Sequence, residues 1–107
     1  MADLASIARI PGVASAVLGD EAGGFHDAIR EGDGESVASV TGFLAASLAR
    51  AGEELGLGAV RRIAAAGEKR GFVIVKVGQA YVTARVEPAS ALGAVERALD
   101  ASAGAGG

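Results

Sequence analysis

The clearest pattern in the chain is a helical repeat of apolar residues between residues 33 and 56. Apolar side chains recur there at steps of three and four, the spacing of one face of an α-helix. These positions are Val37, Val40, Leu44, Leu48, Ala51 and Leu55. Asp33 or Ser36 can cap the start, and Gly56 and Gly58 follow the last periodic residue. The pattern predicts an amphipathic helix of about five turns whose large apolar stripe packs on the rest of the domain.

The same helix carries a second face of unusual composition. Phe43, Ala46 and Arg50 repeat along it, and small residues lie close by. The small residues are Ala38, Gly42, Ala45, Ala49 and Gly52. Because small side chains let two helices approach closely, we expect a second helix to pack against this face.

Runs of β-branched and apolar residues on either side of the long helix predict strands. They cover residues 13–18, 25–29, 60–66, 72–77 and 80–86, with turn-forming residues between them. A short helix precedes the first strand, and a final helix follows Pro88, with Ser90 as its cap. The order α-β-β-α-β-β-β-α predicts an α/β domain of the α+β kind, in which helices flank a five-stranded antiparallel sheet.

Composition limits the class of protein. The chain has 107 residues, half of them hydrophobic, which suits one domain over residues 1–100. We expect the Ala-, Ser- and Gly-only segment 101–107 to be a disordered tail. A net charge of −3 and the lack of any basic run argue against nucleic acid as a partner. The absence of cysteine favours the cytoplasm, and no apolar run is long enough for insertion into a membrane.

A search for chemistry finds no candidate active site. No phosphate-binding Gly-Lys-Ser/Thr occurs, and Gly56-Leu57-Gly58 closes a helix instead of opening one after a strand. His26, the single histidine, has Asp27 beside it, but neighbours on a strand point to opposite faces. The ligands for a zinc site are missing. We therefore expect no enzyme activity, no catalytic residue, no cofactor and no metal.

Arg61-Arg62 is the most informative charge feature, and it has two interpretations. Both arginines lie at the start of what is expected to be an edge strand. Arginine is favoured at protein interfaces, where it pairs with carboxylates. Charge on an edge strand also prevents unwanted pairing with other chains. The sequence alone supports both interpretations equally.

Several stretches, taken in order, resemble the roadblock family of dynein light chains and its bacterial relatives. Ile10 to Leu18 is similar to the family's opening, I-x-G-V-x-G-A-V. Leu55 to Gly58 resembles the Leu-Gly-x-Gly that ends the family's long helix, and Val86 to Gly93 is similar to its D-P-x-A-N-L-G entry into the last helix. Ser15 and Glu87 depart from the pattern, where glycine and aspartate are usual. The resemblance covers nearly the whole chain.

The resemblance implies a homodimer and a small GTPase partner. In the family, the long helices of two subunits pack together, and the strand after the long helix pairs with its twin in one continuous sheet. Bacterial members bind Ras-like GTPases, and some stimulate GTP hydrolysis by the partner. We therefore expect a cytoplasmic adaptor or regulator of the bacterial branch. The expected interface residues are Ser39, Phe43, Ala46, Arg50, Val60, Arg61, Arg62 and Ile63.

The alternative is a small-molecule sensory or binding module of profilin-like layout, because a fold of this kind does not fix a function. Such a module needs a pocket of roughly 300–1,000 Å³ lined by apolar groups and a few polar ones. Aromatic residues, which often line such pockets, make up only 4% of the chain, and this scarcity disfavours the alternative.

Overall fold

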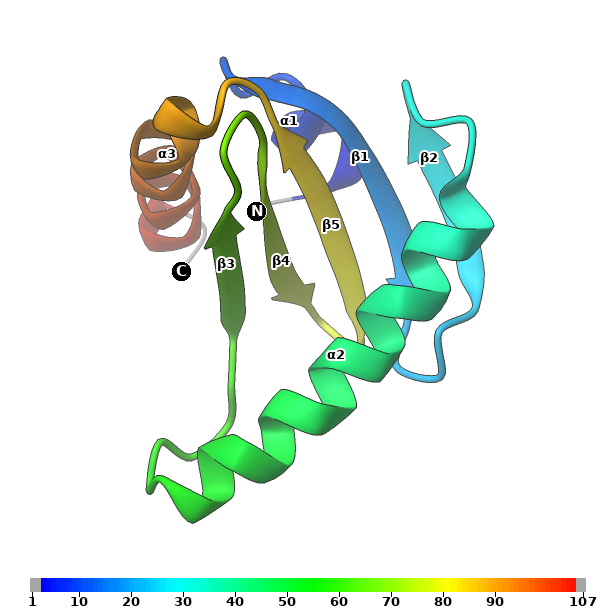
Figure 1. The fold of residues 1–107 in the computed structure, drawn as a ribbon, viewed down its shortest axis with the longest axis vertical. Helices are drawn as coiled ribbons and strands as arrows, with labels where there is room; N and C mark the ends of the chain where they lie inside the picture. Colours follow the sequence, from blue (N-terminus) through cyan, green and yellow to red (C-terminus); the bar gives the residue numbers. More distant parts are fainter. Residues whose placement is uncertain (1–2, 106–107) are drawn as a thin grey trace.

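Five strands form one antiparallel sheet in the computed structural model, which describes residues 3–105 (Figure 1). The strands are β1 (Val13–Asp20), β2 (Phe25–Ile29), β3 (Arg62–Ala66), β4 (Gly71–Val77) and β5 (Ala80–Val86). Their order is β2-β1-β5-β4-β3, which places β2 and β3 at the two edges. The helices are α1 (Leu4–Ala8), α2 (Gly34–Glu54) and α3 (Leu92–Ala105), with a 3₁₀ turn η1 (Ala89–Ala91) before α3. This architecture confirms the predicted fold class.

The two faces of the sheet are covered unequally. The short helix α1 and the C-terminal helix α3 lie on one face, and α2 crosses the other face diagonally (Figure 1). The main core lies on the α1–α3 side. Its fully buried side chains include Ile7, Val73, Val82, Val86, Val95 and Leu99. On the α2 side, the helix contacts mainly β1 and β2, so the sheet is less completely covered there.

The orientation of α2 corrects the prediction from the apolar repeat. The small residues face the sheet: the buried positions of α2 are Gly34, Ala38, Thr41, Gly42, Ala45 and Gly52. Val40 is 57% exposed and Leu55 is 74% exposed. Close packing explains this orientation, because a Cβ on Gly42 would lie 2.7 Å from the Cα of Gly23 in the β1–β2 turn. The small face lets the helix rest on the hairpin, and the large apolar stripe is left turned away from it.

Several element boundaries differ from the expected ones by a few residues. β3 begins at Arg62, so Val60 and Arg61 lie in the connection before it. Ser90 lies inside η1 and is not the cap of the final helix. α3 continues to Ala105, into the segment 101–107 for which the sequence predicts disorder, because alanine favours helix continuation. Residues 106–107 lie outside the described part of the chain.

Candidate interaction surface

The edge strand β3 offers an unpaired row of backbone groups. Among residues 3–105, β3 pairs with β4 alone. The amide N–H of Lys76 donates to Arg61, and that of Gly67 donates to Arg70. Because hydrogen-bonded pairs alternate along an antiparallel ladder, the N–H and C=O of Ala64 point away from β4, toward the open edge. Exposed alanines at 64–66 leave this edge short, apolar and accessible.

The predicted residues on α2 lie together on an exposed face. Ser39, Phe43, Ala46 and Arg50 are all exposed, and the Phe43 side chain retains 71% of its accessible surface. A phenylalanine this exposed is costly in water unless another surface covers it. Around the helix, the buried small-residue face lies between the apolar stripe and the face that carries these four residues.

The residues predicted on and before β3 separate into two groups. Val60 and Ile63 are half-buried and lie beneath α2, where they line a small cavity with Ala45 and Ala49. Arg62 points to the opposite face and forms a 2.5 Å ion pair with Asp100 of α3. The hydrogen bond from Arg62 lowers the pKa of the exposed Asp100 carboxyl. The structure therefore brings Ile63 to the α2 side and places Arg62 against α3.

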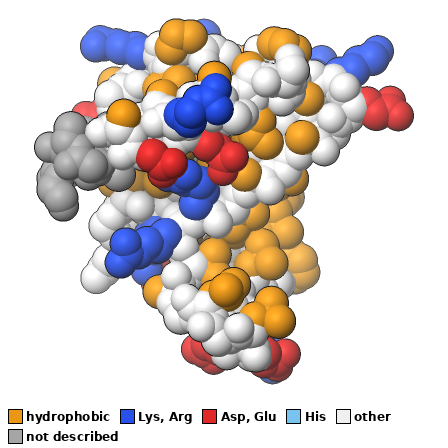
Figure 2. Space-filling view, turned by 90° about the vertical axis from the view of Figure 1, so that its left-hand side faces the viewer, with side chains coloured by type: hydrophobic (Ala, Val, Ile, Leu, Met, Phe, Trp, Pro, Cys, Tyr) orange, Lys and Arg blue, Asp and Glu red, His pale blue; other side chains and the backbone are white. Residues whose placement is uncertain are grey.

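A groove between α2 and the sheet was not predicted from the sequence. It has a volume of about 650 Å³ and runs from the apolar stripe of α2 to the end of β3. Its apolar wall consists of Val17, Val37, Val40, Leu44, Ala65, Phe72 and Ile74. The apolar repeat of α2 was the sequence signal for this groove, because Val37, Val40 and Leu44 of that repeat line it. The repeat did not show that this stripe would face a groove and not a filled core. Figure 2 looks onto the β3 edge and shows hydrophobic side chains gathered on the side of the molecule that carries α2.

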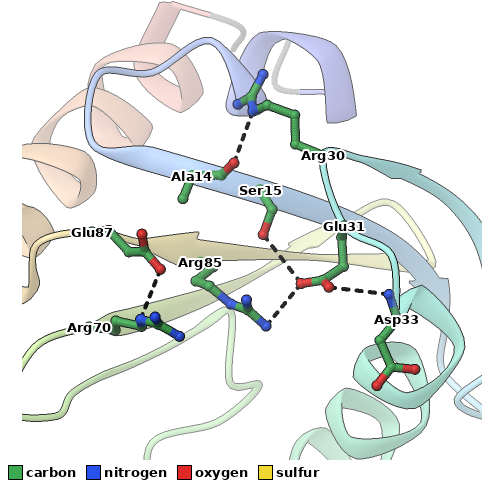
Figure 3. Close-up of polar contacts among 8 residues, drawn as sticks. All are labelled: Ala14, Ser15, Arg30, Glu31, Asp33, Arg70, Arg85 and Glu87. Carbon is green, nitrogen blue, oxygen red and sulfur yellow. Dashed lines mark hydrogen bonds and ion pairs between the residues drawn. The ribbon is translucent and has the colours of Figure 1, made fainter.

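The polar end of the groove is built around Glu31. Its side chain is only 9% exposed and accepts hydrogen bonds from Arg85 at 2.9 Å and from Ser15 at 3.4 Å (Figure 3). The backbone N–H of Asp33 donates to its other oxygen at 3.2 Å. Arg70 lies near this end and pairs with Glu87. This network satisfies a nearly buried carboxylate and fixes the connection between β2 and α2.

The single histidine pairs with an aspartate other than its neighbour. His26 lies 3.1 Å from Asp20 across the β1–β2 hairpin, and both side chains are about half exposed. Two hydrogen bonds lower the pKa of the Asp20 carboxyl. The larger effect comes from the backbone N–H of Gly24 and the smaller from the side chain of His26. Within residues 3–105, no group of three or more His, Asp and Glu side chains could hold a metal ion. No helix in the described residues is long and apolar enough to cross a membrane.

The fold was compared with those of known proteins. No family model matches the sequence, and no curated protein matches it. Among solved structures, MglB of Myxococcus xanthus matches with a TM-score of 0.77 and 17% identity, over 89% of this chain and 80% of that one. A Roadblock/LC7 domain from Streptomyces avermitilis matches with a TM-score of 0.73 and 19% identity, over 92% and 89% of the two chains. The chain has the roadblock fold. The gliding protein MglB of Thermus thermophilus also matches, at a TM-score of 0.72 and 17% identity, over 88% and 77% of the two chains.

The roadblock fold confirms the resemblance seen in the sequence motifs. An MglB with a tetrameric arrangement matches as well, at a TM-score of 0.68 and 18% identity, over 78% of this chain and 67% of that one. Within residues 3–105, β3 is an edge strand, and α2 is the element that precedes it in the chain.

Proposed function

We propose that this protein is a homodimeric adaptor or regulator that binds a small Ras-like GTPase in the bacterial cytoplasm and modulates GTP hydrolysis by its partner. The observation that carries the proposal is that two elements adjacent in the chain, α2 and β3, both expose groups that a partner could cover. The open edge of β3 and the apolar side chains of α2, Phe43 among them, have no covering partner among residues 3–105. The likeness to MglB and roadblock structures supports the class of partner.

The proposed dimer forms by antiparallel pairing of β3 with its copy. A two-fold axis perpendicular to the sheet joins the two sheets edge to edge and keeps both α2 helices on the same side. The outward backbone groups of Arg62, Ala64 and Ala66 then find partners. The result is one continuous ten-stranded sheet, twice the five strands of the monomer, that presents two copies of α2 to a third protein.

The proposed regulation acts through the partner's own active site. Arg62 is held by Asp100, and the exposed Arg50 and Arg61 lie on different elements. We therefore expect Arg50→Ala and Arg61→Ala to weaken binding of the GTPase without lowering the hydrolysis rate at saturation. A loss of the saturated rate with unchanged affinity would instead identify that arginine as part of the catalytic step.

A binding experiment tests the proposal. The protein is mixed with the small Ras-like GTPase of the same organism, loaded with GDP or with a non-hydrolysable GTP analogue, and passed over a sizing column. We expect co-elution in at least one nucleotide state. Phe43→Asp should abolish co-elution, because a charge replaces an exposed apolar contact, and Gln79→Asp in the distant β4–β5 turn is the matched control. Absence of co-elution in both states would reject the GTPase as partner.

The alternative of a small-molecule module has one observation in its favour. The groove of about 650 Å³ has the volume and the largely apolar wall of a ligand pocket, with Glu31, Arg70 and Arg85 at one end. A metabolite that raises the melting temperature of wild-type protein, but not of a Leu44→Arg variant that fills the groove with a charged side chain, would favour this alternative.

A further inference from the structure

The two edges of the sheet differ, and we propose that the carboxylate of Asp27 closes the β2 edge to pairing with another strand. Within residues 3–105, β2 pairs with β1 alone, just as β3 pairs with β4 alone. An exposed edge strand is a template for a further strand, so a sheet with two open edges can add copies without end. The inference rests on the proposed β3 dimer and gives a reason why assembly stops at two chains.

The Asp27 carboxylate holds an outward backbone N–H of β2. The N–H of Ala28 donates to Oδ1 of Asp27 at 2.8 Å. Ala28 lies opposite Val17 in the register with β1, and hydrogen-bonded pairs alternate along such a ladder. Because its N–H is held by a side chain of its own strand, Ala28 directs its backbone groups to the open edge. A carbonyl of an added strand would have to displace a carboxylate, which is the stronger acceptor.

Two backbone features of β2 act in the same direction. A β-bulge between Phe25 and Asp27 leaves His26 as the extra residue in the register with β1. Bulges bend and twist an edge away from a flat partner strand. Arg30, directly after the strand, has a φ of 60°, which an extended ladder cannot continue. These features leave Ala28 as the outward residue best placed to pair, and Asp27 covers it.

The β3 edge is built differently. Its register with β4 runs without a bulge from Arg62 to Ala66. Its exposed end consists of alanines 64–66, which have no side-chain group that could cap an outward N–H. One edge is therefore open and the other closed, so each chain can pair once. Two chains joined at β3 present only closed β2 edges to further copies.

The molar mass of Asp27→Ala, measured by sedimentation equilibrium from micromolar to millimolar concentration, tests the proposal. We expect wild type to stay at two chains and Asp27→Ala to form species of four chains and more. The association constant between dimers should rise by roughly tenfold or more, because the freed N–H can pair with another strand. Asp33→Ala is the matched control, since it removes the same charge from an exposed carboxylate that caps no helix N–H.

Two further variants locate the pairing. Asp27→Ala/Ala28→Pro lacks the outward N–H and should return to the wild-type mass, with a native circular dichroism spectrum. Ala64→Pro removes the outward N–H of β3 and should be monomeric. Adding Asp27→Ala to it should give dimers that grow no further, because β2 is then the edge that pairs.

The outcomes separate this inference from the proposed function. An Asp27→Ala variant with the wild-type mass at every concentration overturns the inference. An equal shift in Asp33→Ala, or large species that persist with Ala28→Pro, overturns it as well. A wild-type mass of one chain rejects the β3 dimer alone, and the closed edge then predicts that Asp27→Ala converts the monomer into a dimer.

Discussion

Arg30 ties the start of the chain to the sheet. Its guanidinium donates to the carbonyl oxygens of Ala8 at 2.6 Å, Ala14 at 2.9 Å and Val13 at 3.3 Å (Figure 3 shows the contact to Ala14). Its backbone has a φ of 60°, in the left-handed region that disfavours residues with a Cβ. The side-chain contacts therefore hold a backbone conformation that the residue does not prefer.

This balance predicts two different losses of stability. Arg30→Ala removes the three hydrogen bonds and keeps the strain, so we expect the free energy of unfolding to fall by about 2–4 kcal/mol. Arg30→Gly removes the same bonds but relieves the backbone, so it should be the more stable of the two by about 1 kcal/mol. Urea denaturation measures both. Equal stability of the two variants would show that the backbone is not strained.

Asp20 contributes stability that depends on pH. Hydrogen bonds from Gly24 and His26 lower its pKa in the folded protein. A lowered pKa means that the contribution is present above the unfolded pKa, about 4, and is lost as the pH falls through the folded value. We expect wild type to be more stable than Asp20→Asn at pH 6, with the difference shrinking between about pH 4 and 2. A difference in melting temperature that stays constant over this range would contradict the assignment.

The order and type of the elements followed from the sequence, but the orientation of α2 did not. Apolar and small residues both recur at helical spacing along it, so periodicity alone identified two faces without saying which one meets the sheet. Close packing determines which face meets the sheet. A Cβ at Gly34 or Gly42 would lie closer to neighbouring atoms than van der Waals contact allows, so only the small-residue face fits there. Such a distance depends on Phe25 and Gly23, which are remote in sequence. The groove and the role of Glu31 were missed for the same reason.

Gly42→Ala tests how α2 rests on the β1–β2 hairpin. Alanine favours the helix by about 1 kcal/mol, but its Cβ would lie 2.7 Å from the Cα of Gly23, which must move. We expect a net destabilisation of about 1–3 kcal/mol in chemical denaturation. Gly93→Ala in α3 is the control, since its Cβ meets only the flexible end of Arg97 at 3.5 Å and should stabilise. A stabilising Gly42→Ala would mean that α2 does not lie this close.

The molecule as a whole has one well-filled layer and one incomplete layer. The α1–α3 side holds the core, whereas the α2 side leaves a groove, an open strand edge and exposed leucines. The motifs of the sequence were sufficient to predict the fold, and the contact region that they predict on α2 and β3 stays a prediction. They could not assign the predicted residues to faces of the sheet. Strand alternation separates Arg62 from Ile63, but it does not say which face packs against α2 and which against α3.

The central claim is that two copies join through the open edge of β3, and the molar mass in solution tests it most directly. We expect light scattering at tens of micromolar to give about twice the chain mass of 10.4 kDa. Ala64→Pro removes an N–H that points away from β4, so the β3–β4 ladder stays intact and the edge can no longer pair. The variant should be a folded monomer. A wild-type mass of one chain, or an Ala64→Pro variant that remains a dimer, would contradict the account.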